Sequence, residues 1–198
     1  MIRIAEERDA APMLEIYAPY VRETTVTFEY EIPSPEAFRQ RFEAVTEKLP
    51  WLVWEESGEI LGYAYASLPF ERAAYAWCAE PSIYLRQDAR GKGIGRQLYA
   101  ALEALLTQMG YAVSFAIITG ENRPSLEFHR ALGYNKCAEM MKCGLKFGRW
   151  LDVYWLEKRL NSVEIPSNPP IVWSKFRKND QRIENILGKM SLSESGKV

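Results

Sequence analysis

Arg90, Gly93 and Gly95 form the pattern Arg-x-x-Gly-x-Gly within the segment from Arg86 to Leu106, and this pattern could hold phosphate. The first amide N–H groups of a helix have no partners inside the helix and lie at its positive end, so a glycine-rich turn that opens a helix binds anions. An apolar stretch, Ser82–Leu85, precedes the turn, and a stripe of leucines follows it. The order predicts a strand, a phosphate-binding turn and a helix.

Two common phosphate-binding motifs do not fit this turn. The dinucleotide fingerprint needs G-x-G-x-x-G, but Gly91, Gly93 and Gly95 alternate, and Arg96 stands where the last glycine is required. The nucleoside triphosphate loop needs Gly-Lys followed by Ser or Thr, whereas Lys92 is followed by glycine. The pattern therefore indicates a pyrophosphate site of another kind.

A strand, R-x-x-G-x-G and a helix in this order resemble the acetyl-CoA signature of the GNAT superfamily of N-acetyltransferases. Further blocks agree and follow in the right order: TTVTFEYE (24–31), PWLVWEESGEILGYAYA (50–66), FERAAYAW (70–77), ENRPSLEFHRALGY (121–134) and GLKFGRWLDVYW (144–155). Together they resemble the phosphinothricin acetyltransferase branch, whose members acetylate the amino group of small amino-acid analogues. The resemblance covers roughly residues 1–160.

The resemblance implies acetyl-CoA as the cosubstrate and no metal. A splayed strand would offer its backbone to the pantetheine arm at Ile83, Tyr84 and Leu85. Asn122 and Ser125 would form hydrogen bonds with the same arm. The alternative for both is a purely structural role in the turn at Pro124. The pyrophosphate would lie on the turn formed by Arg90, Gly91, Lys92, Gly93, Ile94, Gly95 and Arg96.

Two residues are candidates for proton transfer. By resemblance, Glu80 is the general base for the substrate ammonium group, and a carboxylate among aromatic and apolar residues is partly desolvated, which raises its pKa. The alternative is a glutamate at a strand kink, or one that only attracts the ammonium group. His129 stands where many members have the tyrosine that protonates the CoA thiolate. A histidine could do this or act on the amine, and a structural hydrogen bond is the alternative.

The resemblance also implies a pocket for the acetyl acceptor. Arg72 and Tyr75 match a segment that lines it, and a guanidinium group pairs bidentately with a carboxylate. A surface salt bridge is the alternative for Arg72. The other positions implied are Phe28 and Glu29 on the opposite wall, and Lys146 and Trp150 at the pocket and the wall of a homodimer.

Periodicity predicts the elements that must position these residues. Helices are expected after Asp9, after Ser34, from Gly93 and from Pro124. The predicted fold class is α/β, with a GNAT-type mixed, mostly antiparallel central sheet, helices on both faces and, by resemblance, a splayed acetyl-CoA-binding strand pair. Strands are expected at 2–5, 51–56, 60–68, about 75–85, 111–118, 138–147 and 150–160.

Composition narrows the partners and the location. The chain has 198 residues, 25 basic and 26 acidic side chains, so it should form one main domain without a nucleic acid or membrane partner. The start MIRIAEERDAAP lacks the apolar core of a signal peptide, and a cytoplasmic protein is expected. Three cysteines without metal-binding spacing, Cys78, Cys137 and Cys143, are expected to be reduced and buried.

The C-terminal segment differs from the rest of the chain. We expect an acetyltransferase domain over 1–160, and a linker plus an amphipathic helix over 161–198. A proline-rich stretch, NSVEIPSNPP, is followed by apolar residues at near-helical spacing, namely Trp173, Phe176, Ile183, Ile186, Leu187 and Met190. Docking on a partner subunit, docking over the active site, packing on its own domain and a frayed end all remain open.

The predicted function is acetyl-CoA-dependent transfer to the amino group of a small amino acid or analogue, of the phosphinothricin, methionine sulfoximine or methionine sulfone type. The expected partners are this small amine and a second copy of the chain. Transfer to another amine or to a protein N-terminus is an alternative, although the aromatic blocks favour a small closed pocket. A second alternative is a protein that binds CoA without catalysing a reaction. The presence of Glu80 together with the complete phosphate-binding turn argues against it.

Overall fold

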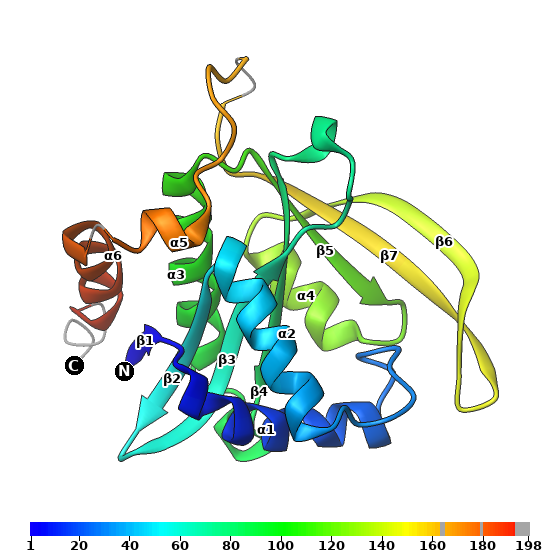
Figure 1. Cartoon of the computed structure of the whole chain (residues 1–198). Helices are drawn as coiled ribbons and strands as arrows, with labels where there is room; N and C mark the ends of the chain where they lie inside the picture. The colour runs from blue at the N-terminus through cyan, green and yellow to red at the C-terminus, as the bar shows by residue number, and fades with distance from the viewer. Residues whose placement is uncertain (163–164, 179, 193–198) are drawn as a thin grey trace.

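The computed structural model describes residues 1–162, 165–178 and 180–192. A seven-stranded sheet in the order β1-β2-β3-β4-β5-β7-β6 forms its centre (Figure 1). All neighbouring strands are antiparallel except β4 and β5, so the predicted mixed, mostly antiparallel sheet is confirmed. The strands are β1 Ile2–Ile4, β2 Trp51–Glu56, β3 Glu59–Ser67, β4 Cys78–Leu85, β5 Val113–Thr119, β6 Asn135–Lys146 and β7 Arg149–Arg159.

The sheet opens between β4 and β5. These parallel strands pair only at Cys78 with Val113 and at Ala79 with Ser114. Beyond this point β4 stays paired with β3 as far as Leu85, whereas β5 pairs with β7. The two strands therefore diverge, as predicted for an acetyl-CoA-binding pair, and we call the space between them the β4–β5 cleft.

Helices cover both faces of the sheet. Alternate residues of a strand face opposite sides, so a strand with apolar residues on both faces, such as β2, needs a helix layer on each side. Trp51 and Val53 of β2 pack in the core under α1 and α2, while Leu52 and Trp54 pack in the core under α3. α4 joins a third core with β5 and β7. The helices are α1 Ala10–Glu23, α2 Pro35–Lys48, α3 Ile94–Met109, α4 Arg123–Ala131, α5 Trp173–Phe176 and α6 Asp180–Leu192.

The C-terminal segment packs on the α3 side of the molecule (Figure 1). Trp173, Phe176 and Ile183 are buried in the same core as α3. The side-chain amide of Asn161 donates to the carbonyl oxygens of Thr107 at 3.0 Å and Tyr111 at 2.7 Å, so it satisfies carbonyl groups at the end of α3. Residues 163–164, 179 and 193–198 and the side chain of Met190 lie outside the described part of the chain.

Two predictions about local structure were wrong. The strand expected from about Tyr75 begins at Cys78, because Tyr75 lies in a tight turn in which its ring packs on Phe70, with centroids 4.5 Å apart. Cys137 and Cys143 are exposed rather than buried, because they lie on β6, one of the two edge strands of the sheet. Within the described residues, no helix is long and apolar enough to cross a membrane.

Candidate active site

The β4–β5 cleft gathers most of the residues predicted to hold the pantetheine arm and to move protons. It is lined from β4, from β5 and from the start of α4. Because the two strands diverge, the backbone of β4 has no strand partner on this side, which suits an extended ligand. Predicted residues in the lining are Glu80, Ile83, Tyr84, Asn122, Ser125 and His129.

The glycine turn has the geometry of an anion cradle. Gly91 and Gly93 have positive φ angles of 75° and 80°, and no atom lies within 4 Å of the position that a Cβ would take in either. Gly93 precedes the first residue of α3, and no side chain caps this helix. The first N–H groups of α3 therefore remain available to a ligand, and exposed Lys92 and Arg96 add positive charge.

Gly95 has a different role from the other two glycines. It lies in the first turn of α3, where a Cβ would be 3.3 Å from Cδ1 of Leu85 and 3.4 Å from Cδ1 of Ile83. Glycine thus lets α3 approach β4 closely and sets the phosphate-binding turn next to the strand. Together the cleft and the turn fit an extended ligand that ends in a pyrophosphate.

The sequence did not indicate that Tyr20 of α1 contacts the end of β4. Its hydroxyl group donates to the carbonyl oxygen of Leu85 at 2.6 Å and accepts from the N–H of the same residue at 3.0 Å. The guanidinium carbon of Arg90 lies 5.1 Å from the centre of the Tyr20 ring. Tyr20 therefore connects α1 to the end of β4 and to the start of the glycine turn.

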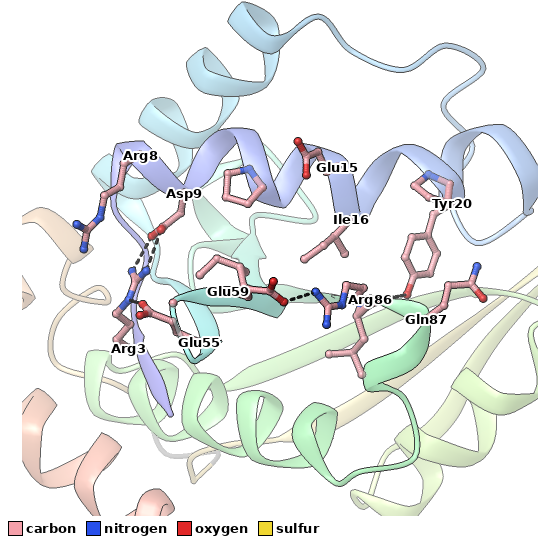
Figure 2. Close-up of a pocket in the computed structure, with 15 residues that line it drawn as sticks. Arg3, Arg8, Asp9, Glu15, Ile16, Tyr20, Glu55, Glu59, Arg86 and Gln87 are labelled. Carbon is pink, nitrogen blue, oxygen red and sulfur yellow. Dashed lines mark hydrogen bonds and ion pairs between the residues drawn. The ribbon is translucent and has the colours of Figure 1, made fainter.

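A wider groove of about 710 Å³ lies between α1, the β2–β3 turn and the end of β4 (Figure 2). Several of its charged side chains form pairs: Arg3 with Asp9 at 2.6 Å, and Arg86 with Glu59 at 2.8 Å (Figure 2). Of the predicted site residues, Leu85 alone lines it. The groove thus contains none of the residues predicted to move protons, which lie in the β4–β5 cleft.

Glu80 lies on β4 opposite Ser67 of β3, just after the last pair that joins β4 to β5. Its side chain is half-buried, and burial raises the pKa of its carboxyl group. In the described part of the chain this carboxyl group has no hydrogen bond or ion pair. A carboxylate with a raised pKa that faces a cleft without a partner is suited to accept a proton.

His129 and the start of α4 form the opposite wall. His129 is 4% exposed, with Nδ1 2.7 Å from the Ser125 carbonyl oxygen and Nε2 3.0 Å from the Tyr99 hydroxyl group. Burial lowers the pKa of the imidazole, and the bond to Ser125 opposes this more weakly. The side-chain oxygen of Asn122 accepts from the Ser125 N–H at 3.3 Å, so Asn122 caps α4 as well as lining the cleft.

A family model described as an acetyltransferase (GNAT) domain matches residues 2–155. The chain belongs to the GNAT acetyltransferase family. The matched range contains the whole sheet up to Trp155, the glycine turn and the β4–β5 cleft. This GNAT protein is an acetyl-CoA-dependent N-acetyltransferase, as predicted.

Similar proteins place this GNAT enzyme near the predicted branch. The phosphinothricin N-acetyltransferase of Alcaligenes faecalis is 35% identical, over 81% of this chain and 83% of that protein. The L-methionine sulfoximine/L-methionine sulfone acetyltransferase of Pseudomonas paraeruginosa is 39% identical, over 81% of this chain and 94% of that protein. A crystal structure of a phosphinothricin acetyltransferase from Sinorhizobium meliloti with acetyl-CoA has a TM-score of 0.80 and 37% identity, over 86% of this chain and 92% of that one. The predicted resemblance to this branch is confirmed.

The acceptor residues predicted for this GNAT enzyme lie in two segments outside the lining of the β4–β5 cleft. Arg72 and Tyr75 occupy the exposed loop between β3 and β4. Glu29 lies in the loop between α1 and α2 and forms an ion pair with Arg41 at 2.6 Å. The sequence did not indicate this pair, because Arg41 belongs to the polar pattern of α2.

The loop between α1 and α2 is fastened to the β6–β7 hairpin of the GNAT domain. Phe28 packs on Gly144 of β6, where a Cβ would overlap the ring. The Lys146 ammonium group donates to the Thr27 carbonyl oxygen at 2.6 Å, and burial lowers the pKa of this lysine. Lys146 is therefore a buried support for the loop, whereas Trp150 is 61% exposed on the hairpin.

Proposed function

We propose that this enzyme acetylates the α-amino group of a small amino acid or analogue, of the phosphinothricin, methionine sulfoximine or methionine sulfone type. The observation that carries the proposal is the β4–β5 cleft, in which an unpaired carboxyl group and a buried histidine line opposite walls. The names of the relatives that match most of the chain support the same acceptor class.

Acetyl-CoA would be held by the chain along β4 and on the glycine turn. Ile83, Tyr84 and Leu85 would pair with the pantetheine arm through their backbone, and Asn122 and Ser125 would bond it from α4. The glycine turn would hold the pyrophosphate through amide N–H groups and basic side chains. Its residues are Arg90, Gly91, Lys92, Gly93, Ile94, Gly95 and Arg96. Bound acetyl-CoA supplies the acetyl group as a reactive thioester.

Glu80 would act as the general base. The amine of an amino acid is an ammonium ion near neutral pH, and it must lose a proton before it can attack a carbonyl carbon. Burial raises the pKa of Glu80, which brings its basicity closer to that of the amine. The Glu80 carboxylate would take the ammonium proton directly or through one water molecule.

His129 would act on the leaving-group side of the cleft. Its Nδ1–H is directed to Ser125, whose hydroxyl oxygen lies 3.3 Å from this nitrogen. The Ser125 hydroxyl group would donate a hydrogen bond to the departing sulfur and stabilise its negative charge, while the neutral imidazole orients Ser125 and keeps its own hydrogen. In this assignment Glu80 serves the amine and His129 serves the leaving group, at opposite ends of the reaction.

The acceptor would be held by residues of the β3–β4 loop and of the loop between α1 and α2. Arg72 would pair with the substrate carboxylate, and the ring of Tyr75 would lie beside it. Phe28 would cover the side chain of the acceptor, and Glu29 would favour its ammonium group electrostatically. The ion pair between Glu29 and Arg41 fixes this carboxylate in place.

A panel of acceptors tests the proposal through the rate of CoA release. Phosphinothricin, methionine sulfoximine, methionine sulfone and ordinary amino acids are compared with their decarboxylated amines and with a short peptide. Arg72→Ala is expected to lower kcat/KM for amino acids far more than for the amines, because a lost partner of a charge pair costs about 2–5 kcal/mol. Equal loss for both classes contradicts a carboxylate contact, and a preference for the peptide contradicts the acceptor class.

A second copy of the chain is the proposed partner of the β6–β7 hairpin. The hairpin extends beyond the body of the molecule (Figure 1) and carries a row of exposed apolar side chains. Apolar patches of this kind mark association surfaces. Light scattering of the native chain and of Trp150→Glu tests this, since the variant should be monomeric. The exposed apolar residues of the hairpin are Met140, Met141, Leu145, Phe147 and Trp150.

A further inference from the structure

The hydrogen bonds of His129 define which nitrogen carries its hydrogen. Nδ1 lies 2.7 Å from the Ser125 carbonyl oxygen, and a carbonyl only accepts, so Nδ1 is the protonated nitrogen. Burial of the ring favours the neutral form, which leaves Nε2 with a lone pair. The contact of 3.0 Å to Tyr99 is therefore a bond from the Tyr99 hydroxyl group to Nε2.

Tyr99 occupies a position that needs no hydroxyl group for packing. It lies on α3, is fully buried, and its ring meets three other rings edge-on, with centroids 5.1 Å from His129, 5.5 Å from Phe128 and 6.0 Å from Tyr134. A phenylalanine ring would make the same contacts. A buried hydroxyl group requires a hydrogen-bond partner, and His129 provides it.

Tyr134 is the other hydroxyl group that interacts with Tyr99, and its own hydrogen is already committed. The Tyr134 hydroxyl group donates to Glu103 at 2.8 Å, and Ser114 lies 2.5 Å from the same hydroxyl oxygen. Glu103, one turn after Tyr99 on α3, also pairs with Lys158 at 2.6 Å. The hydrogen of Tyr134 is thus used by a carboxylate, and Tyr99 is the donor that serves the imidazole.

Few ionisable groups face the imidazole. Tyr99 faces it from α3, Tyr134 from the turn after α4, and Glu80 shares the cleft with it from β4. Burial raises the pKa of Tyr99 well above its ordinary value, and neighbouring Tyr134, Glu103 and Glu80 act in the same direction. Tyr99 therefore remains a neutral hydrogen-bond donor at every pH at which the enzyme works.

We propose that Tyr99 is a positioning residue for acetyl transfer: its buried hydroxyl group holds His129 as the neutral Nδ1–H tautomer, so that the N–H of the imidazole is directed to Ser125 and the cleft. The role in transfer rests on the proposed function. The same helix carries the phosphate-binding turn at its start, so α3 sets both the cofactor site and the histidine.

The tautomer can be measured on the native enzyme alone. His129 is the only histidine in the chain, so a two-bond ¹⁵N–¹H spectrum of ring-labelled protein contains the signals of one imidazole. The expected spectrum has a protonated Nδ1 and an unprotonated Nε2 with the chemical shift of a hydrogen-bond acceptor. A protonated Nε2 in the neutral ring would overturn the proposal, whatever the variants do.

Tyr99→Phe tests the role in the reaction. The variant keeps the ring and removes the donor, so the Nε2 signal should move towards that of a free nitrogen and the titration midpoint of His129 should rise. We expect kcat to fall roughly 10- to 100-fold, as for a misplaced catalytic group, with an unchanged KM for acetyl-CoA. Ser114→Ala is the matched control, because it loses one buried hydrogen bond of the same network without touching His129.

Three results would overturn the proposal. An unchanged Nε2 signal in Tyr99→Phe would show that the hydroxyl group does not hold the ring. A kcat equal to that of Ser114→Ala would reduce Tyr99 to a stabilising residue. A native enzyme that acetylates no amine would overturn the proposed function and the role in transfer together, while the histidine spectrum would still decide the tautomer separately.

Discussion

The hydroxyl group of Tyr20 bonds both backbone groups of Leu85, donating to its C=O at 2.6 Å and accepting from its N–H at 3.0 Å. These groups lie at the end of β4, beyond the point where β5 diverges. In the proposed function they pair with the pantetheine arm. One hydroxyl group cannot keep both bonds while a ligand takes its place, so Tyr20 and acetyl-CoA would compete for Leu85 in the proposed function.

Tyr20→Phe should destabilise the ligand-free enzyme, in which Tyr20 bonds Leu85, but not the enzyme with CoA bound. Without ligand, the variant leaves a partly buried N–H and C=O unpaired, so the free energy of unfolding should fall by about 1–3 kcal/mol. Binding of CoA restores partners for these groups, so the dissociation constant measured by calorimetry should decrease, roughly tenfold for 1.4 kcal/mol. Weaker binding of CoA would show instead that the hydroxyl group supports the ligand-bound strand.

Glu80→Gln tests the general base. The amide keeps the shape of the side chain but accepts no proton, so kcat should fall about 10²–10⁴-fold while CoA still binds. Burial raises the pKa of Glu80, and the base works only when ionised, so native kcat/KM should rise with pH through a value above the ordinary pKa of a glutamate. This limb should be lost in the variant. Glu127→Gln, an exposed change on α4, is the control and should leave the pH profile unchanged.

Local signals explain what the sequence predicted correctly. The glycine turn, the leucine stripe of α3 and the alternation in β2 are patterns within short segments, and each element formed within a few residues of its expected bounds. The divergence of β4 from β5 followed from the resemblance rather than from any local pattern. Glu80 and His129, which line the cleft, were also predicted from the resemblance.

Contacts between distant segments account for what the sequence did not predict. Tyr20 reaches Leu85 across 65 residues and Tyr99 reaches His129 across 30, and both tyrosines read as ordinary apolar positions of amphipathic helices. The pairing of Glu29 with Arg41 has the same origin. Periodicity indicates which face of a helix is buried, but it does not indicate which hydroxyl group or charge it meets.

Gly93→Val should impair acetyl-CoA binding specifically. Position 93 has a φ angle of 80°, which a β-branched residue adopts only with strain, and the added side chain would occupy the open space of the cradle. We expect a strong rise in the KM for acetyl-CoA in a folded protein. Gly58→Val is the matched control: its φ angle is 83°, and its Cβ also meets no atom within 4 Å, but it lies in the β2–β3 turn. If both variants raise KM equally, the cradle is excluded.

Gly144→Ala should change the acceptor site while the acetyl-CoA site is preserved. The added methyl group would overlap the Phe28 ring, so the ring and its loop must shift. A change of this size in an apolar pocket is worth about 10-fold or more in kcat/KM for the acceptor. Steady-state kinetics with each substrate varied should place the loss on the acceptor alone. Gly148→Asn, in the turn of the same hairpin, is the control, because asparagine tolerates its positive φ angle.

Trp173→Ala tests whether the C-terminal segment is part of the core of the domain. Trp173 is completely buried in the core that also contains residues of α3 and β2, and truncating a buried tryptophan typically costs about 3–5 kcal/mol. Urea denaturation of the full chain should show this loss. Ile165→Ala is the control in the same segment: Ile165 is 95% exposed, and its truncation should change the free energy of unfolding by less than about 0.5 kcal/mol.

The KM for acetyl-CoA should remain unchanged in both variants, because the segment supports the end of α3 that is remote from the glycine turn. Equal stability of the two variants would mean that the segment does not dock on α3 in solution.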